Sequence, residues 1–158
     1  MKKLLKLNNI QKRYFDINQL NQEPSLEQFE NDNKDLIKIA FSSREPYPRD
    51  FGMSVLEVIG HDEGDMDLSR LNNKAALLFN HNWDEIIGVV KKAYIEDGVG
   101  YAFIQLSTTA EKYKILVSEG ILSKVSFGYE ITAMERIGEQ DGIPLVKVKT
   151  TPYEISLV

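Results

Sequence analysis

The chain has 158 residues, of which 42% are hydrophobic and 27% charged, and its formal net charge is −5. This length supports one well-packed domain. The negative charge argues against broad binding to nucleic-acid phosphates, which requires a clustered excess of lysine and arginine. Because the chain contains no cysteine, disulfide frameworks and thiolate metal sites are excluded. We expect no cofactor and no metal.

The sequence shows no sign of export or membrane insertion. No apolar run approaches the roughly 20 residues of a membrane-spanning helix. Residues 1–7 contain three lysines, but Asn8 and Asn9 follow directly, so the apolar stretch of a secretory signal is missing. We therefore expect a soluble protein that is not exported and does not bind membranes.

Residues 1–34 form a polar N-terminal arm, which we expect to be partly disordered, and residues 35–158 form the domain. The first thirteen residues carry five basic and no acidic side chains. They are suited either to contact an acidic partner or to remain a solvated terminus, and a solvated terminus is the commoner case. Residues 25–28 (SLEQ) resemble a capping box and predict a short helix.

The first half of the domain reads as short strands. Strands are predicted at residues 36–41, 53–59, 75–79, 86–95 and 100–106, because these runs are apolar or alternate in polarity. Residues 42–51 contain two prolines and predict a loop, whereas residues 60–67 form an acidic, glycine-containing turn. Residues 68–73 predict a short helical turn. Asp97 and Gly98 predict a hairpin turn.

The second half contains the clearest helix. It is predicted to begin at the capping box of residues 108–111 and to end at Gly120. Strands follow at residues 124–132, 145–150 and 153–158, with a polar hairpin at residues 138–142. Many short strands with one central helix predict a mainly β (α+β) fold, an antiparallel barrel or sandwich with a few surrounding helices.

Ser126 is the candidate nucleophile. Residues 125, 127, 129 and 131 alternate onto one apolar face of their strand, which places Ser126 and Gly128 on the other face. Two small residues there predict open space for an approaching peptide, since glycine within a strand often marks close approach of another backbone. The alternative is that Ser126 is simply a small residue on the surface of the sheet.

The two histidines of the chain are the candidates for the general base. The imidazole side chain exchanges a proton near neutral pH and can accept one from serine. His81 follows a strongly apolar strand that would fix its position, whereas His61 lies in a glycine- and aspartate-rich turn that looks mobile. We therefore favour His81. Both histidines also fit a purely structural role, and the acidic residues around His61 suggest either a cation site or, better, a solvated acidic loop.

A third residue, a carboxylate, is needed to hold the tautomer of the histidine and to stabilise its protonated form. Glu154 is the candidate, because Tyr153, Ile155 and Leu157 alternate on one face of the last strand and leave Glu154 on the other. Asp84 and Glu85 are alternatives close to His81 in the chain. The pattern alone does not choose among them, and an exposed glutamate explains Glu154 equally well.

Several pieces, in this order, make the chain resemble a known family. The pieces are residues 40–46 (AFSSREP), 52 with 55–58 (G and VLEV), 67–71 (DLSRL), 77–82 (LLFNHN), 87–90 (IGVV), 120–122 (GIL), 125–129 (VSFGY) and 152–158 (PYEISLV). Together they resemble the phage prohead (capsid-maturation) serine proteases, which are related in fold to the herpesvirus assemblin proteases. The resemblance covers residues 37–158.

This resemblance implies a closed antiparallel β-barrel and a serine endopeptidase with Ser126 as nucleophile, His81 as base and Glu154 as third member. It further implies cleavage of scaffold or capsid protein, and of the protease itself, inside the assembling prohead in the host cytoplasm. Self-association is expected by analogy with the herpesvirus relatives. No nucleic-acid or membrane partner is expected.

The chain departs from the family pattern at two places. Asn82 stands where the family often has aspartate after the histidine, which favours Glu154 as the acidic member. The family pattern usually continues beyond the last strand, whereas this chain stops at Val158, as would a trimmed chain, a self-processed product or the protease part of a longer polyprotein.

Two functions from other classes remain open. One is a catalytically silent β-barrel module that serves in capsid assembly. The other is an oligonucleotide-binding barrel, against which the acidic balance and the lack of an aromatic and basic face argue.

Overall fold

The computed structural model describes residues 10–16, 29 and 35–158. The strands in these ranges are β1 (Ile10–Asp16), β2 (Ile37–Ser42), β3 (Tyr47–Asp50), β4 (Ser54–Ile59), β5 (Ala76–Phe79), β6 (Asn82–Glu96), β7 (Val99–Leu106), β8 (Lys124–Gln140) and β9 (Ile143–Leu157). A 3₁₀ turn, η3 (Thr108–Ala110), and the helix α2 (Glu111–Ser118) connect β7 to β8. The mainly β prediction is confirmed.

The N-terminal arm is described only in part. Within it, β1 pairs antiparallel with β8, while the short helix predicted at residues 25–28 lies outside the described residues. The boundary between arm and domain near residue 35 stays a prediction.

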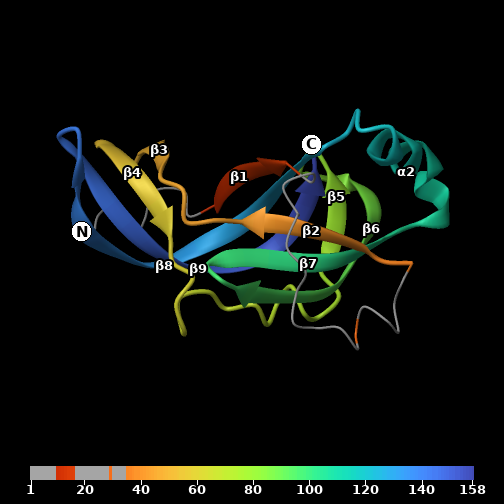
Figure 1. Cartoon of the computed structure of the whole chain (residues 1–158), viewed down its shortest axis with the longest axis horizontal. Helices are drawn as coiled ribbons and strands as arrows, with labels where there is room; N and C mark the ends of the chain where they lie inside the picture. Colours follow the sequence, from red (N-terminus) through yellow and green to blue (C-terminus); the bar gives the residue numbers. More distant parts are fainter. Residues whose placement is uncertain (1–9, 17–28, 30–34) are drawn as a thin grey trace.

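The strands form one sheet in the order β1-β8-β9-β5-β6-β7-β2. β9 pairs antiparallel with β8 but parallel with two other strands, with β4 near its start and with β5 near its end. The turn that joins β8 to β9 and the β3–β4 pair therefore lie at one end of the molecule, and α2 lies at the other (Figure 1).

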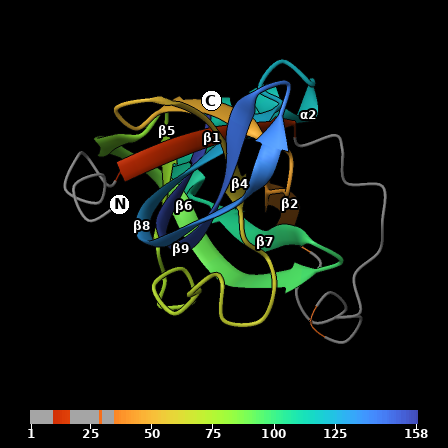
Figure 2. The ribbon, with the colours of Figure 1, turned by 90° about the vertical axis from the view of Figure 1, so that its left-hand side faces the viewer.

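The sheet is open, so the prediction of a closed barrel is wrong. It curls around a common interior (Figure 2), and its outermost strands β1 and β2 approach each other, but in the described residues no ladder joins them. Closure needs a matched tilt and register between the first and last strands. Here β1 pairs with β8, and β2 pairs with β7. Where a few surrounding helices were expected, residues 35–158 contain one α-helix, α2.

The hairpin turns and the helix end follow the prediction. Asp97 and Gly98 have φ values of 49° and 74°, and they join the paired residues Glu96 and Val99 as a two-residue turn. Gly120 ends the helix with φ of 72°. The N-cap differs by one residue from the predicted box, because the Ser107 side chain accepts the hydrogen bond from the Thr109 amide.

The core lies on one face of the strands that carry the candidate site. Val125, Phe127, Tyr129 and Ile131 are all buried in it, as the alternation predicts.

The sequence analysis missed β3, because a four-residue strand containing Pro48 reads as a loop. Pro48 is tolerated because β3 pairs with one strand, β4, and so lies at an edge of the sheet. At an edge the missing amide hydrogen of proline costs no ladder hydrogen bond.

No helix in the described part of the chain is both long and apolar enough to cross a membrane.

Candidate active site

The candidate site is built on the pairing of β8 with β9. In the antiparallel register Ser126 lies opposite Ser156, and Gly128 lies opposite Glu154. Side chains of directly opposed residues project from the same face of a sheet. The register therefore brings Ser126 and Glu154 together on the face away from the apolar core.

His81 lies in a tight turn beside these two strands. The turn joins Phe79 of β5 to Asn82 of β6, which are paired, and its central residues Asn80 and His81 have φ values of 51° and 59°. Two left-handed residues are typical of a type I′ hairpin turn. The Asn80 amide donates to the Leu157 carbonyl at 2.9 Å, which fixes the turn to the end of β9.

The three predicted residues are hydrogen-bonded in series. The distance from His81 Nε2 to Ser126 Oγ is 2.8 Å, and the distance from His81 Nδ1 to Glu154 Oε1 is 2.5 Å. A carboxylate can only accept, so the Nδ1–H group donates to Glu154, and Nε2 is left to accept the proton of the Ser126 hydroxyl. This arrangement can generate a serine nucleophile.

Ser156 is a fourth member that the sequence analysis missed. Its hydroxyl donates to Glu154 Oε2 at 2.7 Å and accepts the His81 amide hydrogen at an N–O distance of 3.1 Å. It is fully buried. Its position, two residues after Glu154 on the same face of β9, is a signal that could have found it.

The space predicted around Gly128 is filled. A Cβ atom at residue 128 would lie 2.6 Å from Glu154 Oε1 and 2.8 Å from the ring atom Cε2 of Tyr153. The expectation of open space there is therefore wrong. Glycine at this position lets Glu154 and Tyr153 pack directly against the backbone of the serine strand.

The Ser126 hydroxyl is enclosed as well. Ser126 has 0% relative exposure, and the side chains of His81 and Glu154 are almost as deeply buried. Burial strengthens the hydrogen bonds of the series, because water competes less for the same groups. It also means that a peptide carbonyl reaches Ser126 only after neighbouring groups have moved.

Comparison with known proteins places this chain in a family. Residues 54–158 match the model of the caudovirus prohead serine protease. The chain belongs to that family. The matched range contains Ser126, His81 and Glu154, and membership indicates a serine protease.

Two similar proteins add context for this family member. The chain is 33% identical over 127 residues to the major capsid protein of Halomonas phage phiHAP-1. This alignment covers 74% of the chain and 20% of the capsid protein. The chain thus spans about a fifth of the length of that relative. A solved structure of the bacteriophage T4 capsid assembly protease overlaps 78% of this chain and 98% of its own, with a TM-score of 0.46 and 8% sequence identity. The relation to the herpesvirus proteases stays a prediction.

The second histidine of the chain, His61, lies in a separate hydrogen-bond network. His61 Nε2 is 2.8 Å from Ser42 Oγ, and His61 Nδ1 is 2.8 Å from the Ile59 carbonyl oxygen. This is a second serine–histidine pair, but a backbone carbonyl takes the place that Glu154 has at His81. Both Ser42 and His61 are buried.

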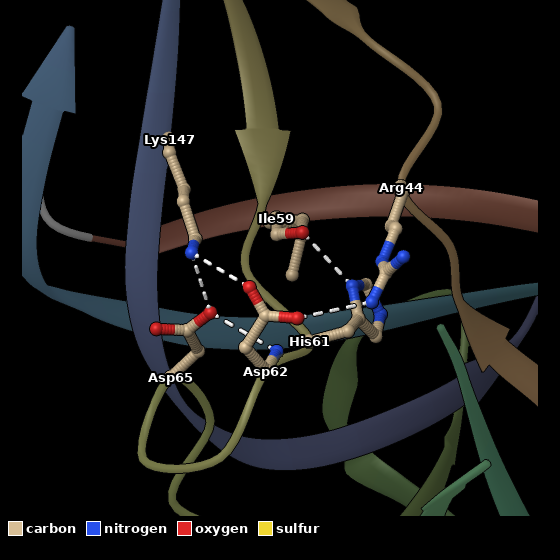
Figure 3. A network of polar contacts seen from close by, with 6 residues as sticks. All are labelled: Arg44, Ile59, His61, Asp62, Asp65 and Lys147. Carbon is tan, nitrogen blue, oxygen red and sulfur yellow. Dashed lines mark hydrogen bonds and ion pairs between the residues drawn. The ribbon is translucent and has the colours of Figure 1, made fainter. Parts of the chain in front are cut away.

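An ion-pair cluster surrounds His61 (Figure 3). Lys147 lies between Asp62 and Asp65, with N–O distances of 3.1 and 2.9 Å, and Arg44 contacts Asp62 at 3.1 Å. The hydrogen bond from Lys147 holds the pKa of Asp62 below its usual value. The interpretation of this stretch as a mobile, solvated loop is wrong for His61 and Asp65, which are buried.

The alternative carboxylates near His81 are engaged elsewhere. Asp84 is exposed, and Glu85 accepts a hydrogen bond from the hydroxyl of Tyr113 in α2. Neither is the partner of His81 Nδ1, which contacts Glu154. Among the described residues no group of three or more His, Asp or Glu side chains is placed to hold a metal ion.

Proposed function

We propose that this protein is a serine endopeptidase in which Ser126 is the nucleophile, His81 the general acid–base and Glu154 the residue that orients His81. The observation that carries the proposal is the series of two short hydrogen bonds from Ser126 through His81 to Glu154. Membership of a serine protease family supports the same assignment.

The chemistry follows from the direction of these hydrogen bonds. Ser126 Oγ attacks the carbonyl carbon of the scissile peptide bond while its proton passes to His81 Nε2. The imidazolium, stabilised by Glu154, then gives this proton to the leaving amine, and an acyl-enzyme remains on Ser126. Water attacks the acyl-enzyme with His81 again as base, which releases the second product and restores the serine.

We further propose that the substrates are scaffold or capsid-protein segments within the assembling prohead of an infected host cell, and that the protease also cleaves its own chain. The family description and the capsid-protein name of a relative support this role. A protease segment within a longer capsid polypeptide would have its substrate on the same chain, which makes self-cleavage the natural first reaction.

The test is cleavage of the phage's own capsid protein by purified protein. Wild-type protein should produce defined fragments, whereas Ser126→Ala and His81→Ala should reduce cleavage to background with unchanged circular dichroism. Ser42→Ala is the matched control, since it removes the hydroxyl of the second serine–histidine pair and should leave cleavage intact.

Cleavage by Ser126→Ala at the wild-type rate would refute the assignment of the nucleophile. Absence of both cleavage and fluorophosphonate labelling in the wild type would instead support the catalytically silent assembly module.

A further inference from the structure

An exposed aromatic side chain lies next to the proposed catalytic residues. Trp83 is 55% exposed, and it follows His81 by two residues at the start of β6. A single exposed apolar side chain is common and needs no explanation. This one, however, stacks on Tyr153, with ring centroids 6.3 Å apart and ring planes 20° from parallel.

Tyr153 is directed toward the site by an irregularity in the sheet. Gly128 pairs with Glu154, but the next residue, Tyr129, pairs with Pro152, so Tyr153 is the extra residue of a β-bulge. A bulge changes the direction of a side chain relative to regular alternation. The sequence pattern assigned Tyr153 to the core face with Ile155 and Leu157, and this assignment is wrong, because the Tyr153 ring packs against Gly128.

Tyr153 precedes Glu154 in the chain, and the side chains of both residues pack against Gly128. Burial, together with the negative charges of Glu154 and Glu130, raises the pKa of Tyr153 to about 12. The Tyr153 ring thus lies beside the carboxylate proposed to orient His81, and the exposed Trp83 ring stacks on it.

Two charged side chains near Tyr153, Arg70 and Glu130, are paired with each other. The Arg70 guanidinium lies over the Tyr153 ring at 5.2 Å and forms an ion pair with Glu130 at 3.3 Å. Arg70 therefore already supplies a cation to the stack, and Glu130 balances it. The half-exposed indole of Trp83 remains as apolar area, and removing such area from water is favourable.

We propose that Trp83 and Tyr153 form a substrate-binding surface that receives a large apolar side chain, aliphatic or aromatic, from a residue of the peptide close to the scissile bond. The inference deepens the proposed protease function and rests on it. Trp83 acts as a specificity-determining residue, since it binds the substrate and takes no part in proton transfer.

The chain offers a direct reporter, because Trp83 is its only tryptophan. Blocked hexapeptides that differ at one position, with Phe, Leu, Lys or Glu in an otherwise constant Ala/Ser sequence, are titrated into full-length Ser126→Ala protein. The Phe and Leu peptides should shift the emission of Trp83 to the blue and protect it from acrylamide. The Phe and Leu peptides should act at concentrations about tenfold or more below those of the Lys and Glu peptides. A tenfold difference in affinity corresponds to about 1.4 kcal/mol of binding free energy.

Equal responses to all four peptides, or a stronger response to Lys or Glu, would overturn the inference. Since this titration does not require cleavage, its outcome is independent of whether the catalytic assignment is right. That assignment fails separately, if wild-type protein neither cleaves nor is labelled.

Cleavage of a peptide library supplies the second readout. Wild-type protein should select large apolar residues at one position near the cleaved bond, and Trp83→Ala should lose this selection with a KM raised about tenfold. Trp83→Phe should keep the selection. The control is Ile137→Ala, which removes an exposed side chain at the far end of β8 and should keep the selection. Unchanged selection by Trp83→Ala would overturn the inference.

Discussion

At the scale of single residues, the site depends on buried groups that satisfy one another. Glu154 accepts from His81 on one oxygen and from Ser156 on the other. Leaving a buried hydrogen-bonding group without its partner costs about 1–3 kcal/mol. Substitutions that nearly keep the size of these side chains remove little packing. They should therefore change function through the geometry and the protonation of the site.

Glu154→Gln tests the role of the carboxylate. The amide keeps the size of the side chain, but it permits the wrong tautomer of His81 and does not stabilise the imidazolium, so kcat should fall by about 10⁴. Steady-state cleavage of a peptide substrate measures the effect, with Glu130→Gln as the exposed control. Activity within tenfold of wild type would exclude Glu154 as the third member.

Ser156→Ala tests whether the fourth hydroxyl positions the site. The variant removes the hydrogen bonds that Ser156 makes with the His81 amide and with Glu154, so the imidazole should shift and kcat should fall by about 10–100-fold with KM unchanged. Ser54→Ala, at an exposed position of β4, is the control. An unchanged kcat would show that Ser156 contributes only to stability.

At the scale of elements, the strands of the site were predictable, but their irregularities were not. The alternation at residues 125–131 gave the correct faces because hydrophobic burial imposes a period of two on a regular strand. The bulge at Tyr153 breaks this period, so the pattern assigned that ring to the wrong face. The burial of Glu154 was equally hidden, since the bonds that satisfy it come from His81 in a distant turn and from Ser156 in the same strand.

Gly128→Ala tests the close packing between β8 and β9. The added methyl group would overlap Glu154 and Tyr153, so the carboxylate should be displaced from His81 and the rate of cleavage should fall by about 100-fold. Thr132→Ala, an exposed change on the same strand, should have little effect. Full activity in Gly128→Ala, with a folded protein by circular dichroism, would show that Glu154 need not occupy this position.

Lys147→Gln tests the cluster that joins the turn after β4 to β9. Asp62 has a folded-state pKa below its ordinary value of 3.8, so its stabilising contribution is present above that pH and is lost as the pH falls through the folded pKa. Lys147 has a raised pKa, so its contribution is present below 10.5 and is lost as the pH rises through the raised value. The melting temperature of the variant should therefore lie below that of wild type near neutral pH, by only a few degrees because Asp62 is exposed.

This difference in melting temperature should disappear at pH values well below 3.8. Lys149→Gln makes the same charge change two residues along β9 and should show a smaller difference. A difference that is the same at pH 7 and at a pH well below the folded-state pKa of Asp62 would mean that the ion pairs contribute no stability.

At the scale of the whole molecule, the sequence predicted a sheet that brings three distant residues together but gave the wrong closure. Closure depends on whether the outermost strands β1 and β2 align, and local patterns of polarity carry no information on that pairing. The geometry of the candidate site does not depend on closure, because Ser126 lies on β8, Glu154 on β9 and His81 in the turn between β5 and β6, and these strands are neighbours in the interior of the sheet.

The most direct test of the central claim is to locate the residue that a serine-directed fluorophosphonate modifies. The reagent is incubated with the intact folded protein, and the adduct is assigned by peptide mass spectrometry. We predict a single adduct on Ser126 that is absent in His81→Ala, because His81 Nε2 lies within hydrogen-bond distance of Ser126 Oγ and is proposed to take its proton. An adduct on Ser42, or labelling of Ser126 that is equally fast without His81, would contradict the account.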